Sequence, residues 1–516
     1  MRVELNIEPN HLIDHLRSLA NSSAKVSADS RQIRSGDIFF AYPVGHGNAL
    51  RDGRQFIDAA LTNGAAAVVF DPAGLDAAYS QNTQCFALEK LSEKVGKLCA
   101  QWYENPSKKL KMIGVTGTNG KTSITQWLAQ ALDQPSHRSA VLGTLGTGFP
   151  NALEKTGYTT PDAPKLQTQL KELLDAGAKQ VAMEVSSHAL HQDRIAGTSF
   201  HCAVFTNLTQ DHLDYHGSMA NYAETKAKLF SQPGLEHAVV NLDDPFGREL
   251  AMNLLARDEL KVWAYALNHS AFKGFEKFGD RLQRIYATEI VLKGAGYEAV
   301  FTDDGVNAYS LQIPLLGEFN LSNALAVWAT LLTQGLNGSE ASKRVAQLQP
   351  VIGRMEIILL GKNPKSEGPL AVVDYAHTPD ALQKTLQALR PIAQQRGGKL
   401  WCVFGCGGNR DSGKRSQMGA VAANFADQII ITSDNPRSED PQVIMDMIRQ
   451  GIQSPNVNVQ VIADRAAAIM AAIRHAEPQD IVLVAGKGHE TSQEINGKKF
   501  DFSDQEHIRL AAGGMV

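Results

Sequence analysis

The sequence predicts an α/β protein in which three units follow one another, and the second and third are each built on a mostly parallel sheet. The first observation is length, because 516 residues suffice for three to four domains of about 150 residues each. The second is that short apolar runs alternate with stretches of helical periodicity, and strands joined by helices pair in parallel. The third is a glycine-rich turn that joins one such strand to one such helix.

The composition excludes several classes of protein. Lys and Arg number 50 against 54 Asp and Glu, a formal net charge of -4, so we expect no surface for nucleic acid or an anionic membrane. Five widely spread cysteines favour free thiols in a reducing compartment over a disulfide framework. The first residues lack a signal-peptide pattern, and no stretch approaches about 20 apolar residues. We therefore expect a soluble cytoplasmic protein.

Residues 1–106 are predicted to form the first and smallest unit. The apolar runs 38–43 and 65–70 are typical of buried strands, and residues 56–64 between them have helical periodicity. Residues 104–110 follow a helical pattern and are rich in turn formers and lysine. We place the first linker there.

Residues 107–352 are predicted to form a central unit with a mostly parallel sheet. It opens with an apolar run, the turn GTNGKT and a helical stretch, and further strand-like runs follow at 181–186, 202–208 and 237–242. Segment 285–313 alternates polar and apolar residues, which predicts a small antiparallel insertion.

Residues 353–516 are predicted to form a third unit, an open doubly wound sheet of the Rossmann-like kind. Four apolar runs interleave with helical stretches, and each ends near Gly, Asp or Asn: 370–376, 399–406, 428–435 and 480–486. In such sheets ligands bind over the carboxyl ends of the strands.

The strongest local signal is the run GVTGTNGKT at residues 114–122. A glycine-rich turn at a helix N-terminus directs backbone N–H groups at a phosphate, and Lys121 can reach the β and γ oxygens while Thr122 offers its hydroxyl to Mg²⁺. The run departs from the strict P-loop pattern because Val115 stands where the first glycine belongs. Nucleotide binding is predicted for the loop residues Gly117, Thr118, Asn119, Gly120, Lys121 and Thr122.

Acidic residues and histidines follow two further strands. Glu184 stands near the end of one strand, where a carboxylate could approach Mg²⁺. The run TNLTQDHLDYHG places Asp211, His212, Asp214 and His216 within six residues, a density that favours a metal or phosphate site. Glu184 could equally be a structural carboxylate at a strand end, and a helix cap would explain Asp211 well. The residues alone therefore leave both a structural role and a metal-binding role open.

Taken together, the motifs resemble those of the ATP-dependent Mur ligases of peptidoglycan synthesis. They occur in that family's order between about residues 28 and 490: GTNGKT, MEVSSH, TNLTQDHLDYHG, NYAETKAKLF, LLGEFNLSNALAV, GRMEII, DYAHTP, GCGGNRD, SDNPRSEDP and AGKGHE. The resemblance implies an N-terminal domain for a UDP sugar, a central P-loop ATPase domain and a C-terminal domain that brings an amino acid. It also implies a reaction in which ATP phosphorylates a carboxylate and an amine attacks the acyl phosphate.

The resemblance further assigns residues to ATP and its metal. Catalytic roles fall to Lys121, His212 and Lys226, and Lys226 matches a lysine that the family carries as a carbamate. The resemblance implies that Mg²⁺ is ligated by Thr122, Glu184, His212 and the carbamate of Lys226. Further nucleotide contacts are implied for Asn320, Asn323, Arg354, Asp374 and His377.

Substrate contacts are implied in the same way. The UDP substrate is assigned to Ser30, His46, Thr159, Thr160, Ser186, Gln192 and Arg194. The amino-acid segment resembles that of family members that add meso-diaminopimelate to UDP-N-acetylmuramoyl-L-alanyl-D-glutamate, and it comprises Arg410, Asp434, Asn435, Pro436, Arg437, Gly486 and Glu490. Arg437 is suited to grip the far carboxylate of diaminopimelate, whereas lysine would present an ammonium there.

Three alternatives remain open at this point. One is the L-lysine-adding ligase of the same family, and the second is a P-loop NTPase switch. The third is a non-catalytic UDP-sugar binding protein. We expect small-molecule substrates as partners, neither nucleic acid nor membrane, and a monomer.

Overall fold

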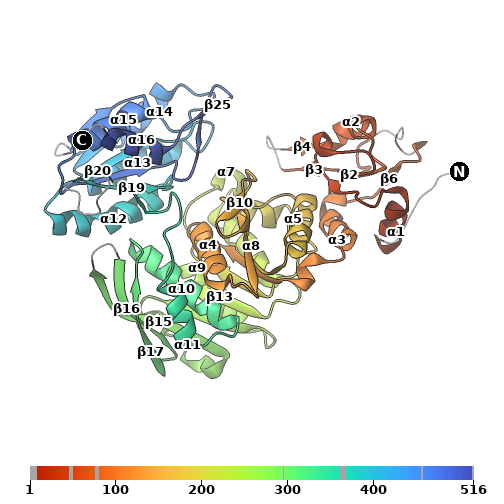
Figure 1. Cartoon of the computed structure of the whole chain (residues 1–516), viewed down its shortest axis with the longest axis horizontal. Helices are drawn as coiled ribbons and strands as arrows, with labels where there is room; N and C mark the ends of the chain where they lie inside the picture. Colours follow the sequence, from red (N-terminus) through yellow and green to blue (C-terminus); the bar gives the residue numbers. More distant parts are fainter. Residues whose placement is uncertain are drawn as a thin grey trace.

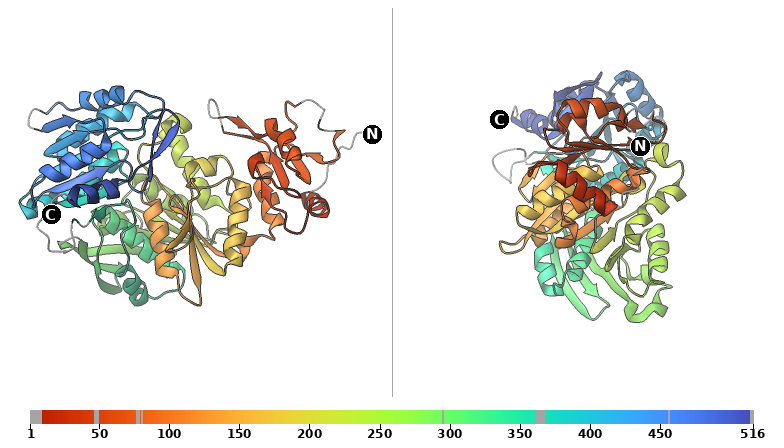
Figure 2. Two further views of the ribbon diagram at one scale, coloured as in Figure 1. Left: turned by 45° about the horizontal axis from the view of Figure 1, so that its top comes forward. Right: turned by 90° about the vertical axis from the view of Figure 1, so that its right-hand side faces the viewer.

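Three larger sheets, each with its own helices, follow one another along the chain (Figure 1). The computed structural model describes residues 9–45, 50–75, 79, 81–293, 296–358, 360, 368–454 and 457–513. The first and third units lie apart from each other, and each adjoins the central unit (Figure 2). Within the described ranges, no helix combines the length and apolarity needed to cross a membrane.

The first unit has a small parallel sheet with helices on both faces. Its helices are α1 (Pro9–Leu19), η1 (Ser30–Gln32), η3 (Gly53–Phe56), α2 (Ile57–Thr62) and α3 (Leu91–Trp102). Its strands are β1 (Val26–Ser27), β2 (Ile38–Ala41), β3 (Pro43–Val44), β4 (Arg51–Asp52), β5 (Ala67–Phe70) and β6 (Cys85–Ala87), with the sheet order β1-β2-β5-β6. Because side chains alternate along a strand, Phe39 and Phe40 of β2 pack in two different apolar clusters.

The central unit contains one sheet of eleven strands. They are β7 (Lys111–Thr116), β8 (Arg138–Gly143), β9 (Gly146–Phe149), β10 (Ala152–Glu154), β11 (Ala178–Glu184), β12 (Cys202–Phe205), β13 (His237–Asn241), β14 (Lys261–Ala266), β15 (Leu282–Lys293), β16 (Gly296–Asp303) and β17 (Asn307–Ile313). Their order is β10-β9-β8-β11-β7-β12-β13-β14-β15-β16-β17, parallel from β8 to β15 and antiparallel at both edges.

The predicted antiparallel segment therefore exists, but it continues the central sheet. Strand β15 pairs in parallel with β14, and β16 and β17 then add antiparallel edge strands. Hydrogen-bonding groups left open at the edge of β14 explain this continuation, because a neighbouring strand satisfies them.

Helices cover both faces of the central sheet. They are η5 (Pro106–Lys109), α4 (Lys121–Leu132), α5 (Ala163–Asp175), α6 (Ser187–His191), α7 (Leu213–His216), α8 (Met219–Ala227), η6 (Lys228–Ser231), α9 (Pro245–Leu254), η7 (His269–Phe272), η8 (Glu276–Arg281), α10 (Glu318–Thr333) and α11 (Gly338–Val345). Met112 of β7 packs in the cluster on one face, and Ile113 and Val115 pack in the cluster on the other. Helix α10 is apolar almost all round and buried, and its amides Asn320 and Asn323 lie near its N-terminus.

The third unit is a six-stranded sheet between helices. Its strands are β18 (Glu356–Ile358), β19 (Leu370–Asp374), β20 (Leu400–Phe404), β21 (Gln428–Ile431), β22 (Asn458–Val461) and β23 (Ile481–Ala485), in the order β18-β19-β23-β20-β21-β22, and all but β18 pair in parallel. Its helices are α12 (Pro379–Arg396), α13 (Gly413–Phe425), α14 (Pro441–Gln450), α15 (Arg465–His475) and α16 (Asp504–Gly513), and a hairpin is formed by β24 (Ser492–Ile495) and β25 (Lys498–Asp501). The predicted three-unit α/β fold is confirmed.

Candidate active site

The glycine-rich loop joins β7 to α4 and requires glycine at two positions. Gly117 has φ 151° and Gly120 has φ 87°, a region that side chains with a Cβ rarely adopt. A Cβ on Gly117 would lie 1.8 Å from the hydroxyl of Thr206, and one on Gly120 would lie 2.6 Å from the side-chain oxygen of Asn323. The loop backbone therefore packs closely against Thr206, which follows β12, and against Asn323 of α10.

Residues after β12 hold the loop in place. The N–H of Thr118 donates to the carbonyl of Asn207 (2.8 Å), and the N–H of Asn119 donates to the Asn207 side chain (2.9 Å). Thr206 in turn donates its hydroxyl to the carbonyl of Asn119 (2.6 Å). These bonds preform the loop, so a phosphate would bind without ordering it first.

Two lysines, one of them the buried Lys226, meet at one carbonyl of this loop. Lys121 donates to the carbonyls of Gly117 and Thr118, each at 2.8 Å, and Lys226 of α8 donates to the same Gly117 carbonyl at 2.7 Å. Burial, followed by the nearby Lys121, holds the pKa of Lys226 well below its usual value. Burial also lowers the pKa of Lys121. An anion bound at this loop would favour the charged form of both amines.

Glu184 ends β11 beside the first turn of α4. Its carboxylate accepts bonds from the hydroxyl of Thr122 (3.0 Å) and from the N–H (2.8 Å) and hydroxyl (3.1 Å) of Thr144. A hydroxyl and a carboxylate side by side form a hard oxygen donor set that fits Mg²⁺.

His212 lies on the opposite side of the loop, at the start of α7. Its Nε2 is 3.4 Å from Asp211 Oδ2. The side chain of His212 is 44% exposed, and its imidazole can ligate a metal when it is neutral.

The third unit reaches the loop through Arg354. Its Nη2 donates to the Thr122 hydroxyl at 3.2 Å, and its guanidinium lies 4.4 Å from the ring centroid of Tyr375. Asp374 is buried and accepts bonds from the N–H groups of Met355 and Ala376, both at 2.8 Å. Asp374 thus holds the segment that carries Arg354.

A second polar cluster forms where β21 and β23 end. Asn435 donates to Glu490 Oε2 at 2.8 Å. The N–H of Arg437 donates to the carbonyl of Glu494 (3.0 Å), and its Nη1 donates to the carbonyl of Gly408 (2.7 Å). In addition, Arg437 Nε lies 3.5 Å from Glu494 Oε2. The hairpin of β24 and β25 therefore supports the segment from Asn435 to Arg437.

Polar residues predicted for the sugar-peptide substrate lie beside Glu184. The Thr160 hydroxyl donates to the Glu184 carbonyl (2.8 Å) and accepts the N–H of Ser186 (3.1 Å). Arg194 donates to the Thr160 carbonyl (3.0 Å) and to the Gln192 side chain (2.9 Å).

One cavity of about 1340 Å³ connects these clusters. The predicted residues that line it are Thr118, Asn119, Gly120, Lys121, Thr122, Thr159, Thr160, Glu184, Ser186, Arg194, His212, Lys226, Asn320, Asn323, Arg354, Asp374, His377, Arg410, Asp434, Asn435, Arg437, Gly486 and Glu490. Those that do not line it are Ser30, Gly117, Gln192 and Pro436. Ser30 begins η1 in the first unit, and His46 lies outside the described residues.

Two sequence families match the chain. The Mur ligase middle domain matches residues 115–331, and the Mur ligase, glutamate ligase domain matches residues 353–488. The chain belongs to the Mur ligase family. The family resemblance inferred from the motifs is therefore confirmed.

Similar proteins cover the chain almost from end to end. The UDP-N-acetylmuramoyl-L-alanyl-D-glutamate--2,6-diaminopimelate ligase of Ralstonia nicotianae is 49% identical, over 97% of this chain and 95% of its own. The protein of the same name from Pseudomonas putida is 46% identical, over 93% of each chain. A solved structure of that ligase is 35% identical with a TM-score of 0.64, over 95% of each chain. The MurF ligase of Thermotoga maritima in complex with ADP, 18% identical with a TM-score of 0.63 over 96% of this chain and 99% of its own, shares the fold.

Sequence reasoning about this Mur ligase missed Lys487. Its side chain is fully buried, and its Nζ donates to Asn435 Oδ1 (3.0 Å) and Glu490 Oε2 (2.9 Å). Lys487 therefore links Asn435 and Glu490, two residues that are predicted to contact the amino acid. The available signal was a lysine between two glycines at the end of a strand, where a buried charge requires a partner.

Proposed function

We propose that this Mur ligase is an ATP-dependent amide ligase that joins meso-diaminopimelate to the D-glutamate of UDP-N-acetylmuramoyl-L-alanyl-D-glutamate, with release of ADP and phosphate. The observation that carries the proposal is the single cavity that holds Lys121 and Lys226 at the glycine-rich loop and also Arg437 and Glu490 at the second cluster. The names of the relatives at 44% to 49% identity support the same substrates.

The first step brings two anions together, because a carboxylate attacks the γ-phosphorus of ATP. Lys121 and Arg354 converge on the loop, and their positive charge lowers the repulsion between the carboxylate and the triphosphate. We assign the nucleotide itself to the loop amides and to Asn320, Asn323, Asp374 and His377, all at the same cavity. The amine of the amino acid then attacks the acyl phosphate.

We assign Mg²⁺ to Thr122, Glu184, His212 and a carbamate on Lys226. When bound, Mg²⁺ would neutralise charge on the phosphate oxygens. The low pKa of Lys226, caused by burial, keeps a fraction of its amine neutral, which is the form that reacts with carbon dioxide. The carbamate would convert a repelling ammonium into an oxygen ligand.

Arg437 is proposed as the specificity residue. Gly408 and Glu494 fix its guanidinium, and a guanidinium binds a carboxylate through two parallel hydrogen bonds. L-lysine would place an ammonium at this point. Glu494 is the one observation that favours the L-lysine alternative, because a carboxylate 3.5 Å from Arg437 Nε offsets part of its charge.

The remaining assignments concern the whole molecule. We propose domain boundaries after residues 106 and 352, where the sheets of the three units are separated in the chain. The UDP moiety is assigned to the first unit around Ser30 and the muramoyl peptide to Thr159, Thr160, Ser186, Gln192 and Arg194. We propose a monomer that acts in the cytoplasm on small molecules.

The deciding experiment measures ADP release with UDP-N-acetylmuramoyl-L-alanyl-D-glutamate and either meso-diaminopimelate, L-lysine or no amino acid. We expect ADP release only when meso-diaminopimelate is the amino acid supplied with the UDP substrate. Release that needs no amino acid would favour an NTPase switch, turnover with L-lysine would favour the alternative ligase, and no release at all would leave a UDP-sugar binding protein.

Arg437→Ala tests the specificity argument in the same assay. We expect kcat/KM for meso-diaminopimelate to fall at least 100-fold while the KM for ATP stays unchanged, because a charge-assisted bidentate contact is lost. Arg449→Ala, an exposed arginine on α14, is the matched control. Unchanged use of meso-diaminopimelate by Arg437→Ala would contradict the assignment.

A further inference from the structure

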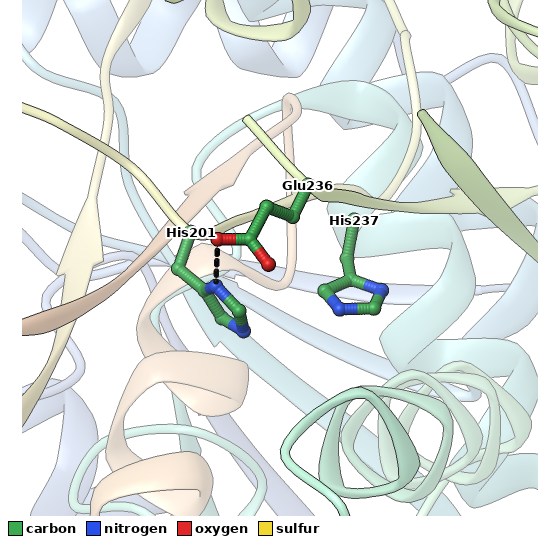
Figure 3. A group of neighbouring side chains, drawn as sticks. All are labelled: His201, Glu236 and His237. Atoms are coloured by element: carbon green, nitrogen blue, oxygen red, sulfur yellow. Dashed lines mark ion pairs between the residues drawn. The ribbon is translucent and has the colours of Figure 1, made fainter. Parts of the chain in front are cut away.

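Two histidines and a glutamate gather at the end of the central sheet that lies opposite the glycine-rich loop. Figure 3 shows their three side chains. His201 immediately precedes β12, and Glu236 and His237 stand at the start of β13. One potential ligand atom from each residue lies within 4.8 Å of the others, and His201 Nδ1 is 3.2 Å from Glu236 Oε1. The loop, by contrast, follows the carboxyl ends of β7 and its neighbours.

The backbone fixes this cluster. The N–H groups of Glu236 and His237 both donate to the carbonyl of His201, at 3.2 and 3.1 Å. Cys202 pairs with His237 in the parallel register of β12 and β13. The three side chains therefore project from paired strand ends, where their Cα positions are preset before any ligand arrives.

We propose that His201, Glu236 and His237 form a binding site for a divalent first-row transition ion such as Zn²⁺, distinct from the Mg²⁺ site at the glycine-rich loop. Two imidazoles and one carboxylate are ligands that suit Zn²⁺, Ni²⁺ and Cu²⁺, whereas Mg²⁺ prefers oxygen ligands alone. The side chain of Glu236 is 65% exposed and that of His201 18%, so water can fill the remaining coordination positions.

Lys111 and Lys261 begin the strands that flank β12 and β13. Lys261 and Lys111 lie close enough to repel a cation. This repulsion disfavours ions held by charge alone and favours ions that bind imidazole strongly.

Trp263 identifies which nitrogen of His237 is available. Its Nε1 donates to Nδ1 of His237 at 3.2 Å, so the neutral ring carries its proton on Nε2. Ligation through Nε2 moves that proton to Nδ1 without net release, and the indole N–H then loses its acceptor. Trp263 is half-buried. Metal binding should therefore change Trp263 fluorescence.

A metal at this position would join the starts of two neighbouring strands. The opposite ends of β12 and β13 lead to Asn207, which holds the loop, and Asn241, whose side chain donates to the Thr206 carbonyl. An ion bound only by the folded chain stabilises it by mass action, so we expect Tm to rise by about 5 °C at a hundredfold excess over Kd.

The test titrates Zn²⁺ into the chelator-treated full chain with Mg²⁺ and ADP at saturation, which occupies the loop site. We expect one equivalent of Zn²⁺ by calorimetry, a change in tryptophan fluorescence and a higher Tm. Glu236→Gln should weaken the affinity at least tenfold, and His201→Gln should abolish binding. Glu249→Gln, an exposed glutamate on α9, should bind as the wild type does.

Two outcomes would overturn the proposal. One is the absence of Zn²⁺ binding in the wild-type chain, and the other is unchanged affinity in both Glu236→Gln and His201→Gln, which would locate the ion elsewhere. Because the chain has five tryptophans, Trp263→Phe identifies the reporter: it should remove the fluorescence change and keep the binding. Glu236 is exposed, so Glu236→Gln keeps the test valid even where a histidine variant folds poorly.

Discussion

The guanidinium of Arg354 donates to the hydroxyl of Thr122 at 3.2 Å, although 232 residues separate them in the chain. Thr122 also donates to Glu184 at 3.0 Å, so this one hydroxyl connects the third unit to the carboxylate at the end of β11. Arg354 is positioned by the ring of Tyr375 and by Asp374, which accepts the N–H of Met355. The proposed site therefore needs the third unit in contact with the loop, as it is in this structure.

Arg354→Ala should lower kcat about 100-fold or more, because a cation is removed from the proposed site of phosphoryl transfer. Arg354→Lys should recover little, since an ammonium cannot reproduce the planar guanidinium. Steady-state kinetics with varied ATP, together with Tm to verify folding, checks this. A kcat within threefold of the wild type in a folded Arg354→Ala protein would contradict it.

Lys226→Met should abolish ligation and stabilise the fold. The pKa of Lys226 is lowered in the folded chain, so between that value and its ordinary one the unfolded chain binds a proton that the folded chain does not. Wild-type stability therefore rises with pH by up to about 1.4 kcal/mol per pH unit from this group, and the Met variant lacks this slope.

Urea unfolding of both proteins at pH 6.5 and 8.5, in buffer depleted of carbon dioxide, measures the effect of Lys226→Met. The stability advantage of the variant should be larger at pH 6.5. Parallel pH profiles would show that the amine is not forced toward its neutral form, and would remove the basis for the proposed carbamate.

Gly486→Ala should weaken the proposed amino-acid site alone. Gly486 has φ 112°, and a Cβ there would lie 2.5 Å from Asp434 Oδ2, so Asp434 must move. We expect the KM for meso-diaminopimelate to rise at least tenfold with an unchanged KM for ATP. Gly397→Ala carries backbone strain at φ 71° but meets no atom within 4 Å, and it is the control. Equal effects of the two variants would show that strain, and not displacement of Asp434, is responsible.

Asp504→Asn should destabilise the chain by about 3–5 kcal/mol, because it leaves a buried arginine without its counter-ion. Arg465 and Asp504 pair at 2.8 and 2.7 Å with no exposure of either side chain, and Arg465 also donates to the Ala485 carbonyl (3.0 Å). Urea unfolding is the measurement, with exposed Glu506→Gln on the same helix as the control. A loss below about 1 kcal/mol would contradict the prediction.

Much of the fold could be predicted because periodicity reports which residues are buried. The runs around Ile38, Val115, Ala182, Val403 and Leu483 all became strands in parallel sheets. Strand order could not be predicted, since β7 lies between β11 and β12 and no local pattern encodes its neighbours. The segment 285–313 was therefore expected as an insertion, whereas its backbone groups complete the edge of the central sheet.

Some residues of the candidate site could be predicted from the sequence, and others could not. Lys121 and Thr122 follow from the local motif, because a loop at a helix N-terminus binds phosphate wherever it occurs. Lys487 was missed because only tertiary packing buries it and pairs it with Glu490.

By itself, the sequence determined the kind of sheets, the glycine-rich loop and the family, because all three depend on residue types at short spacing. Tertiary structure alone decided that Lys226 shares a carbonyl with Lys121 and that Arg354 meets Thr122. It also decided that His201 lies beside Glu236 and His237. The physical reason is that these contacts arise when distant strands pair and whole units dock. The energies of pairing and docking are sums over many residues, so no single segment of the sequence encodes these contacts.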